Sequence, residues 1–258
     1  SLCEYFLSLG ANINEKDNYG EPALHKAAFN NNKDIAELFI SNGANINEKD
    51  KNNETALHQA AEYNSKETAE LLISHGANVN EKDYYGRTAL HIAAWFNNKE
   101  ITELLISHGA NINEKDNFGG PALHEAANNN SKEIAELLIS LGANVNEKDD
   151  HGNTALHNAV QHNSKETAEL LISHGANINE KDNDGKTALH EATQFNYREI
   201  TELLISHGAN INEKNKYGET ALHYTAYSNY KEIAKLLISH GANINEKNNN
   251  GETALHKA

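Results

Sequence analysis

One histidine that recurs every 33 residues constrains the fold of this chain more than any other feature. It closes a stretch such as NINEKDNYGEPALH (residues 12–25), and close copies of this stretch return at constant spacing. A period of about 20 to 50 residues is typical of one supersecondary unit stacked on copies of itself. Each unit then contacts only its neighbours, so we expect an array without a single central core. The recurring histidines are His25, His58, His91, His124, His157, His190, His223 and His256.

The repeat register divides the chain into complete and partial units. Each complete unit begins at the aspartate position of the Glu-Lys-Asp motif. Residues 1–16 are the back half of an earlier unit, and residues 248–258 are the front third of a later one. We expect a single array over residues 1–258, with complete units at 17–49, 50–82, 83–115, 116–148, 149–181, 182–214 and 215–247.

Each unit carries the signals of two short helices and an extended arm. In residues 83–115, Thr88 is expected to cap the first helix, and Asn97 to end it in the left-handed region. Serine or asparagine, such as Ser65 and Asn98, is expected to cap the second helix through its side chain. Gly109 ends that helix, and Ala-Asn-Ile-Asn leads into the arm.

The motif D-x-x-G-x-T-A-L-H-x-A-A, followed by L-L-I-S-x-G-A-N-I-N, resembles the ankyrin repeat over all 258 residues. The resemblance implies an all-α fold, an ankyrin-repeat α-solenoid of helix–turn–helix repeats with β-hairpin-like arms. Alanine replaces the family's proline after the threonine, and asparagine replaces the glycine of the first loop. Pro22 and Pro121 replace the threonine, so the helices that follow them are expected to be slightly less stable. The asparagine-rich sequence is also similar to expanded ankyrin families of protozoan parasites.

Thirteen of the fifteen histidines have structural interpretations. The resemblance implies that the eight recurring ones bond backbone and threonine groups between neighbouring loops. Five more precede the helix-ending glycine, where a protonated imidazole interacts favourably with the exposed carbonyls: His75, His108, His174, His207 and His240. Protonation of all fifteen would take the formal charge from −15 to 0. A further hypothesis is therefore that acidification through about pH 6.5 promotes association.

Composition and motifs argue against several classes of function. A net charge of −15 would repel polyphosphate, whereas a nucleic-acid-binding protein needs a basic stripe. Cys3 is the only cysteine, which excludes an intrachain disulfide or a cysteine-built zinc site. No leader-like or long apolar segment predicts secretion or a membrane span. Carboxylates such as Glu48 and Glu81 recur once per unit as a solvated ladder, so no catalytic, cofactor or metal site is expected.

Residues that vary between units carry the candidate binding surface. The resemblance to ankyrin proteins implies that the arm tips and the ends of the first helices line a concave groove for protein partners. Aromatic residues gather in these positions, as at Phe29 and Tyr63. A first patch has the Tyr, Trp and Arg character of interface hot spots: Tyr84, Tyr85, Arg87, Trp95, Phe96 and Phe118. A second, tyrosine-rich patch comprises Phe195, Tyr197, Tyr224, Tyr227 and Tyr230, and Tyr217, near an arm tip, is a further candidate.

Two of these tyrosines, Tyr197 and Tyr230, stand where serine or asparagine caps the second helix in other units. Each is expected to lose about 1 kcal/mol of the free energy with which an N-cap side chain stabilises a helix. The alternative for every ring is packing against a neighbouring repeat, since exposed apolar side chains are common on protein surfaces.

We therefore expect a non-catalytic scaffold that binds a protein partner of unknown identity, in the cytoplasm or the nucleus. Two alternatives remain: the array positions a catalytic domain outside these residues, or it serves as an elastic structural spacer. Apolar residues at both ends, such as Leu2 and Leu255, also predict head-to-tail self-association. The end of one copy nearly completes the unit with which the next copy begins, and such a contact need not close.

Overall fold

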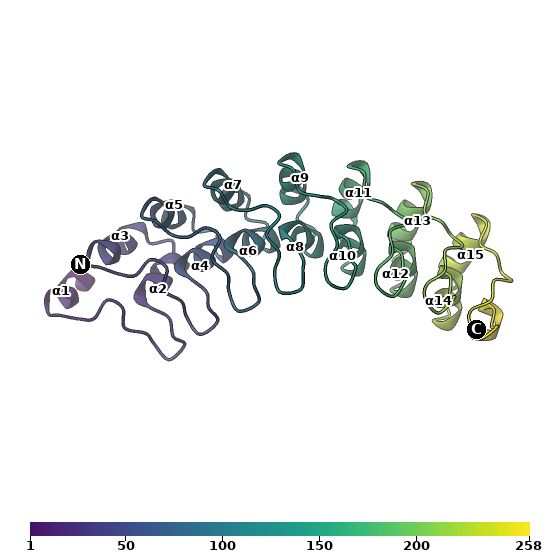
Figure 1. Cartoon of the computed structure of the whole chain (residues 1–258), viewed down its shortest axis with the longest axis horizontal. Coiled ribbons are helices and arrows are strands. Elements are labelled where there is room, and N and C mark those ends of the chain that lie inside the picture. The colour runs from purple at the N-terminus through teal and green to yellow at the C-terminus, as the bar shows by residue number, and fades with distance from the viewer. The chain divides into compact units, whose positions relative to one another are not determined.

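The computed structural model describes residues 1–258 and contains sixteen α-helices and no β-strand (Figure 1). The chain forms two compact units, residues 1–117 and 118–258. In residues 1–117, the first helices of the repeats are α2 (Ala23–Phe29), α4 (Ala56–Glu62) and α6 (Ala89–Trp95). The second helices are α1 (Leu2–Ser8), α3 (Lys33–Ser41), α5 (Lys66–Ser74) and α7 (Lys99–Ser107).

The same alternation continues in residues 118–258. The first helices there are α8 (Ala122–Asn128), α10 (Ala155–Gln161), α12 (Ala188–Gln194), α14 (Ala221–Tyr227) and α16 (Ala254–Lys257). The second helices are α9 (Lys132–Ser140), α11 (Lys165–Ser173), α13 (Arg198–Ser206) and α15 (Lys231–Ser239). Within each unit the first helices form one row and the second helices another, and the arms extend from the row of first helices (Figure 1). The predicted all-α solenoid of paired helices is confirmed.

The first helices pack closely through small apolar residues, and all but α16 end before an asparagine in the left-handed region. In α4, Leu57, Ala60 and Ala61 are buried, and Thr55 stands at the N-cap. Asn64 follows the helix with φ of 54°, a left-handed conformation that asparagine adopts more readily than most residues. The predicted left-handed asparagines are confirmed in all seven loops, at Asn31, Asn64, Asn97, Asn130, Asn163, Asn196 and Asn229.

The second helices bury one aliphatic face and keep their charges on the other. In α7, Ile101 and Leu105 are fully buried, whereas Lys99 and Glu103 form an exposed ion pair of 3.9 Å. The helix ends at Ser107, and Gly109 follows two residues later with φ of 87°. This spacing of buried and exposed residues is that of an amphipathic helix.

The predicted side-chain caps of the second helices are wrong at Ser65 and Asn98. Both residues occupy the N-cap, but neither side chain accepts a hydrogen bond from the helix. The Asn98 amide instead donates to the carbonyl oxygens of Ala61 and Glu62, at 2.7 and 3.1 Å. Ser65 is buried. The Ser65 hydroxyl is buried without a hydrogen-bond partner, so only Asn98 joins neighbouring repeats through its side chain instead of capping its own helix.

The arms are hydrogen-bonded turns that pair with one another without forming strands. The Asp50 carboxylate accepts the backbone N–H groups of Asn52 and Glu54, both at 2.8 Å, which closes the turn. The backbone N–H of Asn117 donates to the carbonyl of Tyr85 in the preceding arm at 2.9 Å. A Cβ on Gly86 would lie 2.7 Å from that same Asn117 nitrogen, so the arms approach too closely for a side chain there. The expected β-hairpin-like arms are therefore confirmed in their turns, but they do not form the strands of a hairpin.

A ladder of lysine–glutamate pairs runs along the arms. The Lys49 ammonium lies 2.7 Å from Glu81 of the next repeat and 3.0 Å from the carbonyl oxygen of Lys82. The bond from Lys49 lowers the pKa of the Glu81 carboxyl. The glutamates predicted to form a solvated ladder are therefore partners in ion pairs between repeats, as Glu48 is with Lys16.

Candidate functional site

The recurring histidine fastens one repeat to the next. Nδ1 of His58 accepts the Thr55 backbone N–H at 3.1 Å and lies 2.9 Å from the Thr55 hydroxyl. Nε2 lies 3.2 Å from the carbonyl oxygen of Arg87 in the next arm, so it carries the proton and donates. Both nitrogens of the neutral imidazole are thus hydrogen-bonded. The structural role that the resemblance to ankyrin repeats implied for this histidine is confirmed.

Burial favours the neutral form of four of these imidazoles. It lowers the pKa of His58 and of His190 to about 4, and it also lowers the pKa of His25 and His157. A charged imidazole would be buried away from solvent. Its protonated Nδ1 would also face the threonine N–H, which is itself a donor. The hypothesis that all fifteen histidines become charged near pH 6.5 is therefore wrong for the folded protein.

The five histidines at the ends of the second helices are exposed and form a different set. Nδ1 of His75 donates to the carbonyl oxygen of Leu71, four residues earlier, at 2.9 Å. The same bond of 2.9 Å recurs at His108, His174, His207 and His240. The Leu71 carbonyl oxygen also accepts the His75 backbone N–H at 3.2 Å, so the imidazole adds a further bond at the helix end, which agrees with the helix-end role inferred from the sequence.

Part of the first predicted patch forms a compact cluster at one arm tip. The rings of Tyr84 and Tyr85 meet edge to face at 5.4 Å between centroids. The Arg87 guanidinium carbon lies 5.1 Å from the centre of the Tyr85 ring. Its nitrogens pair with Asp83 at 2.7 and 2.8 Å, so Arg87 is already bound to a carboxylate. Tyr84 is the most exposed member, at 66%.

The other members of the first patch lie elsewhere. Trp95 is the last residue of α6 and Phe96 follows it, whereas the tip cluster precedes α6. Seven helical residues span roughly 10 Å, so the cluster and the two rings stand at opposite ends of the helix. Trp95 and Phe96 are both partly exposed. Phe118 is exposed as well and is the first residue of the second unit.

The second predicted patch separates into two groups. Phe195 and Tyr197 stack with their ring centres 5.7 Å apart, at the loop between α12 and α13. Tyr224 and Tyr227 lie on α14 and line a cavity of about 210 Å³ that also contacts Lys257. Tyr217 is exposed at an arm tip, and Tyr230 is half-buried at the start of α15.

Tyr224 is a packing residue, as the alternative interpretation of these rings proposed. Its ring meets His190 edge on, with centroids 6.0 Å apart, and Lys186 lies 5.7 Å above it. Its hydroxyl accepts a hydrogen bond of 3.0 Å from the Asn215 amide. Burial raises the pKa of Tyr224 to about 12. Tyr227, at 78% exposed, is the member of this pair that faces solvent.

The proposed loss of capping at Tyr197 and Tyr230 is supported at only one equivalent N-cap, where the Asn32 side chain accepts the Ile35 backbone N–H at 3.2 Å. Both tyrosines occupy N-caps without a side-chain cap. Ser131 and Ser164, at the equivalent N-caps of α9 and α11, make none either. A tyrosine therefore forgoes no helix cap that these serines provide.

One group was not identified as a site from the sequence. Phe29, at the end of α2, contacts Tyr63, at the end of α4, with ring centroids 4.2 Å apart. Both rings are more than two-fifths exposed. Nearby, burial raises the pKa of Glu54 to about 7, and the carboxylates of Asp50, Glu62 and Asp83 contribute. The rings were visible in the sequence as aromatic helix ends, but no pattern marked the carboxylate beside them.

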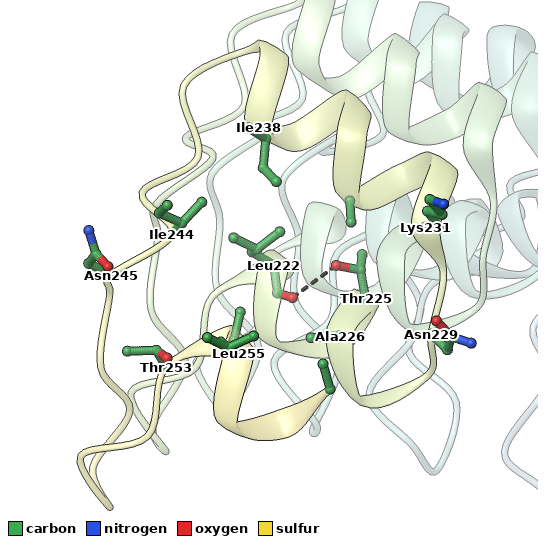
Figure 2. Close-up of a pocket in the computed structure, with 13 residues that line it drawn as sticks. Leu222, Thr225, Ala226, Asn229, Lys231, Ile238, Ile244, Asn245, Thr253 and Leu255 are labelled. Carbon is green, nitrogen blue, oxygen red and sulfur yellow. Dashed lines mark hydrogen bonds between the residues drawn. The ribbon is translucent and has the colours of Figure 1, made fainter.

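An apolar cavity of about 410 Å³ lies between α14, α15 and α16. Figure 2 shows Leu222, Ile238, Ile244 and Leu255 directed into it, while Thr225 bonds back to the Leu222 carbonyl at 2.9 Å. Ile238, Ile244 and Leu255 are each about half exposed or more. The cavity therefore offers aliphatic surface to a further apolar element.

Paired helices in repeated units, with arms bonded to arms, define the class of helical repeat proteins. The chain matches the family model for ankyrin repeats (three copies) at residues 1–83, 42–116, 83–149, 123–215 and 211–258. These segments together cover the whole chain, so the protein belongs to the ankyrin-repeat family. A comparison with curated proteins gives no match. Ankyrin repeats generally act as protein-interaction modules, and none of the sixteen helices has the length and hydropathy needed to cross a membrane.

Proposed function

We propose that this protein is a non-catalytic scaffold that binds a protein partner through its first-helix face. This face comprises the arm tips and the ends of the first helices. One observation carries the proposal: large rings stay exposed there, although apolar packing would normally bury them. They include Tyr84, Trp95, Phe96, Phe195 and Tyr227. Its single thiol, Cys3, is free and suits a reducing compartment such as the cytoplasm or the nucleus.

A paired capture experiment tests this proposal. The wild-type chain and a Tyr85→Ala, Trp95→Ala, Phe96→Ser variant are used to capture proteins from a lysate of the source organism. Leu141→Ala serves as the control, because Leu141 is an exposed apolar residue at the end of a second helix. We expect a partner that the wild type and the control retain and that the variant loses, at unchanged melting temperature.

Other outcomes point elsewhere. If all three chains capture the same partner, the face on α12 and α14 is tested next with Phe195→Ala and Tyr227→Ala. If those variants also retain the partner, the first-helix face is not the binding surface. If none of the chains captures a protein, the alternative of a structural spacer is favoured. A catalytic motif in a longer parent reading frame would favour an array that positions an enzyme.

We propose as a second candidate that copies of this chain associate end to end. In α15, the core positions Ile233 and Leu237 are at most 1% exposed. The same register positions in α1 hold Leu2 and Phe6, which are 66% and 51% exposed. A helix with this exposed apolar face fits the aliphatic cavity beside α15 and α16, whose lining includes Ile238.

Sedimentation velocity over a range of concentrations tests the second candidate. We expect the wild type to form larger species as concentration rises, and Ile238→Lys to stay monomeric because it places a charge in the cavity. Leu141→Lys is the control for an added charge elsewhere. A wild type that is monomeric at every concentration excludes the contact in solution.

A further inference from the structure

The Phe29–Tyr63 patch combines an exposed aromatic pair with carboxylates that have few cations near them. It consists of Phe29, Tyr63, Glu54 and Glu62, on α2, on α4 and on the arm before α4. Gln59 donates to the Glu54 carboxylate at 3.0 Å and so fixes it along α4. Burial raises the pKa of the Tyr63 hydroxyl, and the carboxylates of Glu62, Glu54 and Glu21 raise it further, so negative charge surrounds this ring.

The nearby cations are already bound to other carboxylates. Arg87 pairs with Asp83 at 2.7 Å and reaches Glu54 only at 4.0 Å. Lys26 pairs with Glu21. Glu62 forms no ion pair, and the Glu54 side chain is only 13% exposed, so its charge is poorly solvated. A carboxylate that is partly desolvated and lacks a close cation is stabilised when a cation approaches.

We propose that the Phe29–Tyr63 patch binds an arginine side chain of the protein partner, with the guanidinium against the two rings and paired with Glu54 and Glu62. This inference rests on the proposed function, because it assigns a chemistry to a partner of the first-helix face. Arginine fits better than lysine, since its planar guanidinium stacks on aromatic rings and donates several hydrogen bonds to carboxylates at once. The chain's net charge of −15 also favours a basic partner.

The test uses a defined probe, a fluorescein-labelled peptide with three arginines separated by Gly-Ser, and a matched peptide with neutral citrulline. Binding is measured by anisotropy at about 0.15 M salt, where charges separated by more than ~8 Å are largely screened. The patch variant is Glu54→Gln, Glu62→Gln. The control variant, Glu37→Gln, Glu70→Gln, makes the same two replacements at exposed positions on α3 and α5.

We expect the wild type and the control to bind the arginine peptide alike, and the patch variant to bind it roughly tenfold more weakly. Tyr63→Ser, which leaves every charge in place, should weaken binding severalfold. The citrulline peptide should not bind, and a lysine peptide should bind less tightly than the arginine peptide. Thermal melts establish that each variant is folded.

Equal weakening by the patch and control variants would overturn the inference, because it would mean that net charge alone attracts the peptide. Equal binding of citrulline, tighter binding of lysine or no binding by the wild type would also overturn it. Failure here leaves the scaffold proposal standing if lysate capture still depends on Trp95 and Phe96. If capture fails while the peptide discriminates between the variants, the scaffold proposal falls and the arginine site remains.

Discussion

Nε2 of His58 donates to the carbonyl oxygen of Arg87, 29 residues further along the chain, over 3.2 Å. The other ring nitrogen accepts from Thr55, so a single neutral side chain connects its own helix start to the next arm. The folded state lowers the pKa of His58 to about 4, whereas an unfolded histidine titrates near its ordinary value of about 6.5. The unfolded chain therefore binds more protons between these two values.

The first prediction follows from this difference. Stability rises with pH wherever the unfolded state binds more protons. The contribution of His58 should therefore be fully present above about pH 6.5 and fall progressively toward pH 4, by about 2–3 kcal/mol. His58→Gln should be less stable at pH 7 and show a shallower loss on acidification, as measured by urea unfolding from pH 7 to 4.5. A variant with the wild-type pH dependence would contradict this prediction.

The second prediction concerns Pro22, which replaces the usual threonine. Nδ1 of His25 is buried and has no hydrogen-bond partner, because proline offers neither an N–H nor a hydroxyl. The backbone of Pro22 has φ of −71° and ψ of 161°, close to the extended conformation of Thr55. Pro22→Thr should therefore raise the free energy of unfolding by about 1 kcal/mol.

Pro22→Ala is the matched control, since it restores the N–H donor without the hydroxyl. It should give a smaller increase than Pro22→Thr in thermal or urea unfolding. If both variants are less stable than the wild type, the rigidity of proline outweighs the missing hydrogen bonds at this position.

The third prediction concerns Glu191, a buried carboxyl group whose effect on the pH dependence of stability is opposite to that of His58. Glu191 is 4% exposed, and its Oε2 has no hydrogen-bond partner, while Gln161 donates to Oε1 at 2.6 Å. Burial raises the pKa of Glu191 to about 7. The folded state then binds more protons than the unfolded state above about pH 4.5, so this contribution to stability is lost as pH rises through 7.

Glu191→Gln removes the ionisation without changing the shape of the side chain. It should stabilise the protein at pH 8 by about 1–3 kcal/mol and have little effect at pH 5. Urea unfolding at the two pH values measures the difference. An equal effect at both would mean that packing, and not charge, determines the change.

The backbone of each repeat could be predicted from the sequence because local chemistry determines it. Asn97 and Gly109 adopt positive φ because few other residues do so at low energy. The side chains were harder to predict. Serine is a common helix cap, but Ser65 is buried and its side chain does not cap α5. The contact of Phe29 with Tyr63 depends on how adjacent helices pack, which no single-repeat pattern contains.

The last prediction separates pairs between repeats from pairs within a helix. Lys49 bonds to Glu81 at 2.7 Å and to the Lys82 carbonyl, and its side chain is 35% exposed. Lys99 lies 3.9 Å from Glu103 on the same helix, and both are more than half exposed. Exposed pairs contribute little, whereas a lysine that also satisfies a carbonyl group contributes more. Lys49→Met should therefore lower the free energy of unfolding by about 0.5–1 kcal/mol and Lys99→Met by less than about 0.3 kcal/mol.

Urea unfolding at low salt measures the effects of both substitutions. The effect of Lys49→Met should shrink at about 1 M salt because the salt screens the ion pair. Equal effects of the two substitutions would mean that the arm ladder adds nothing to the coupling between repeats.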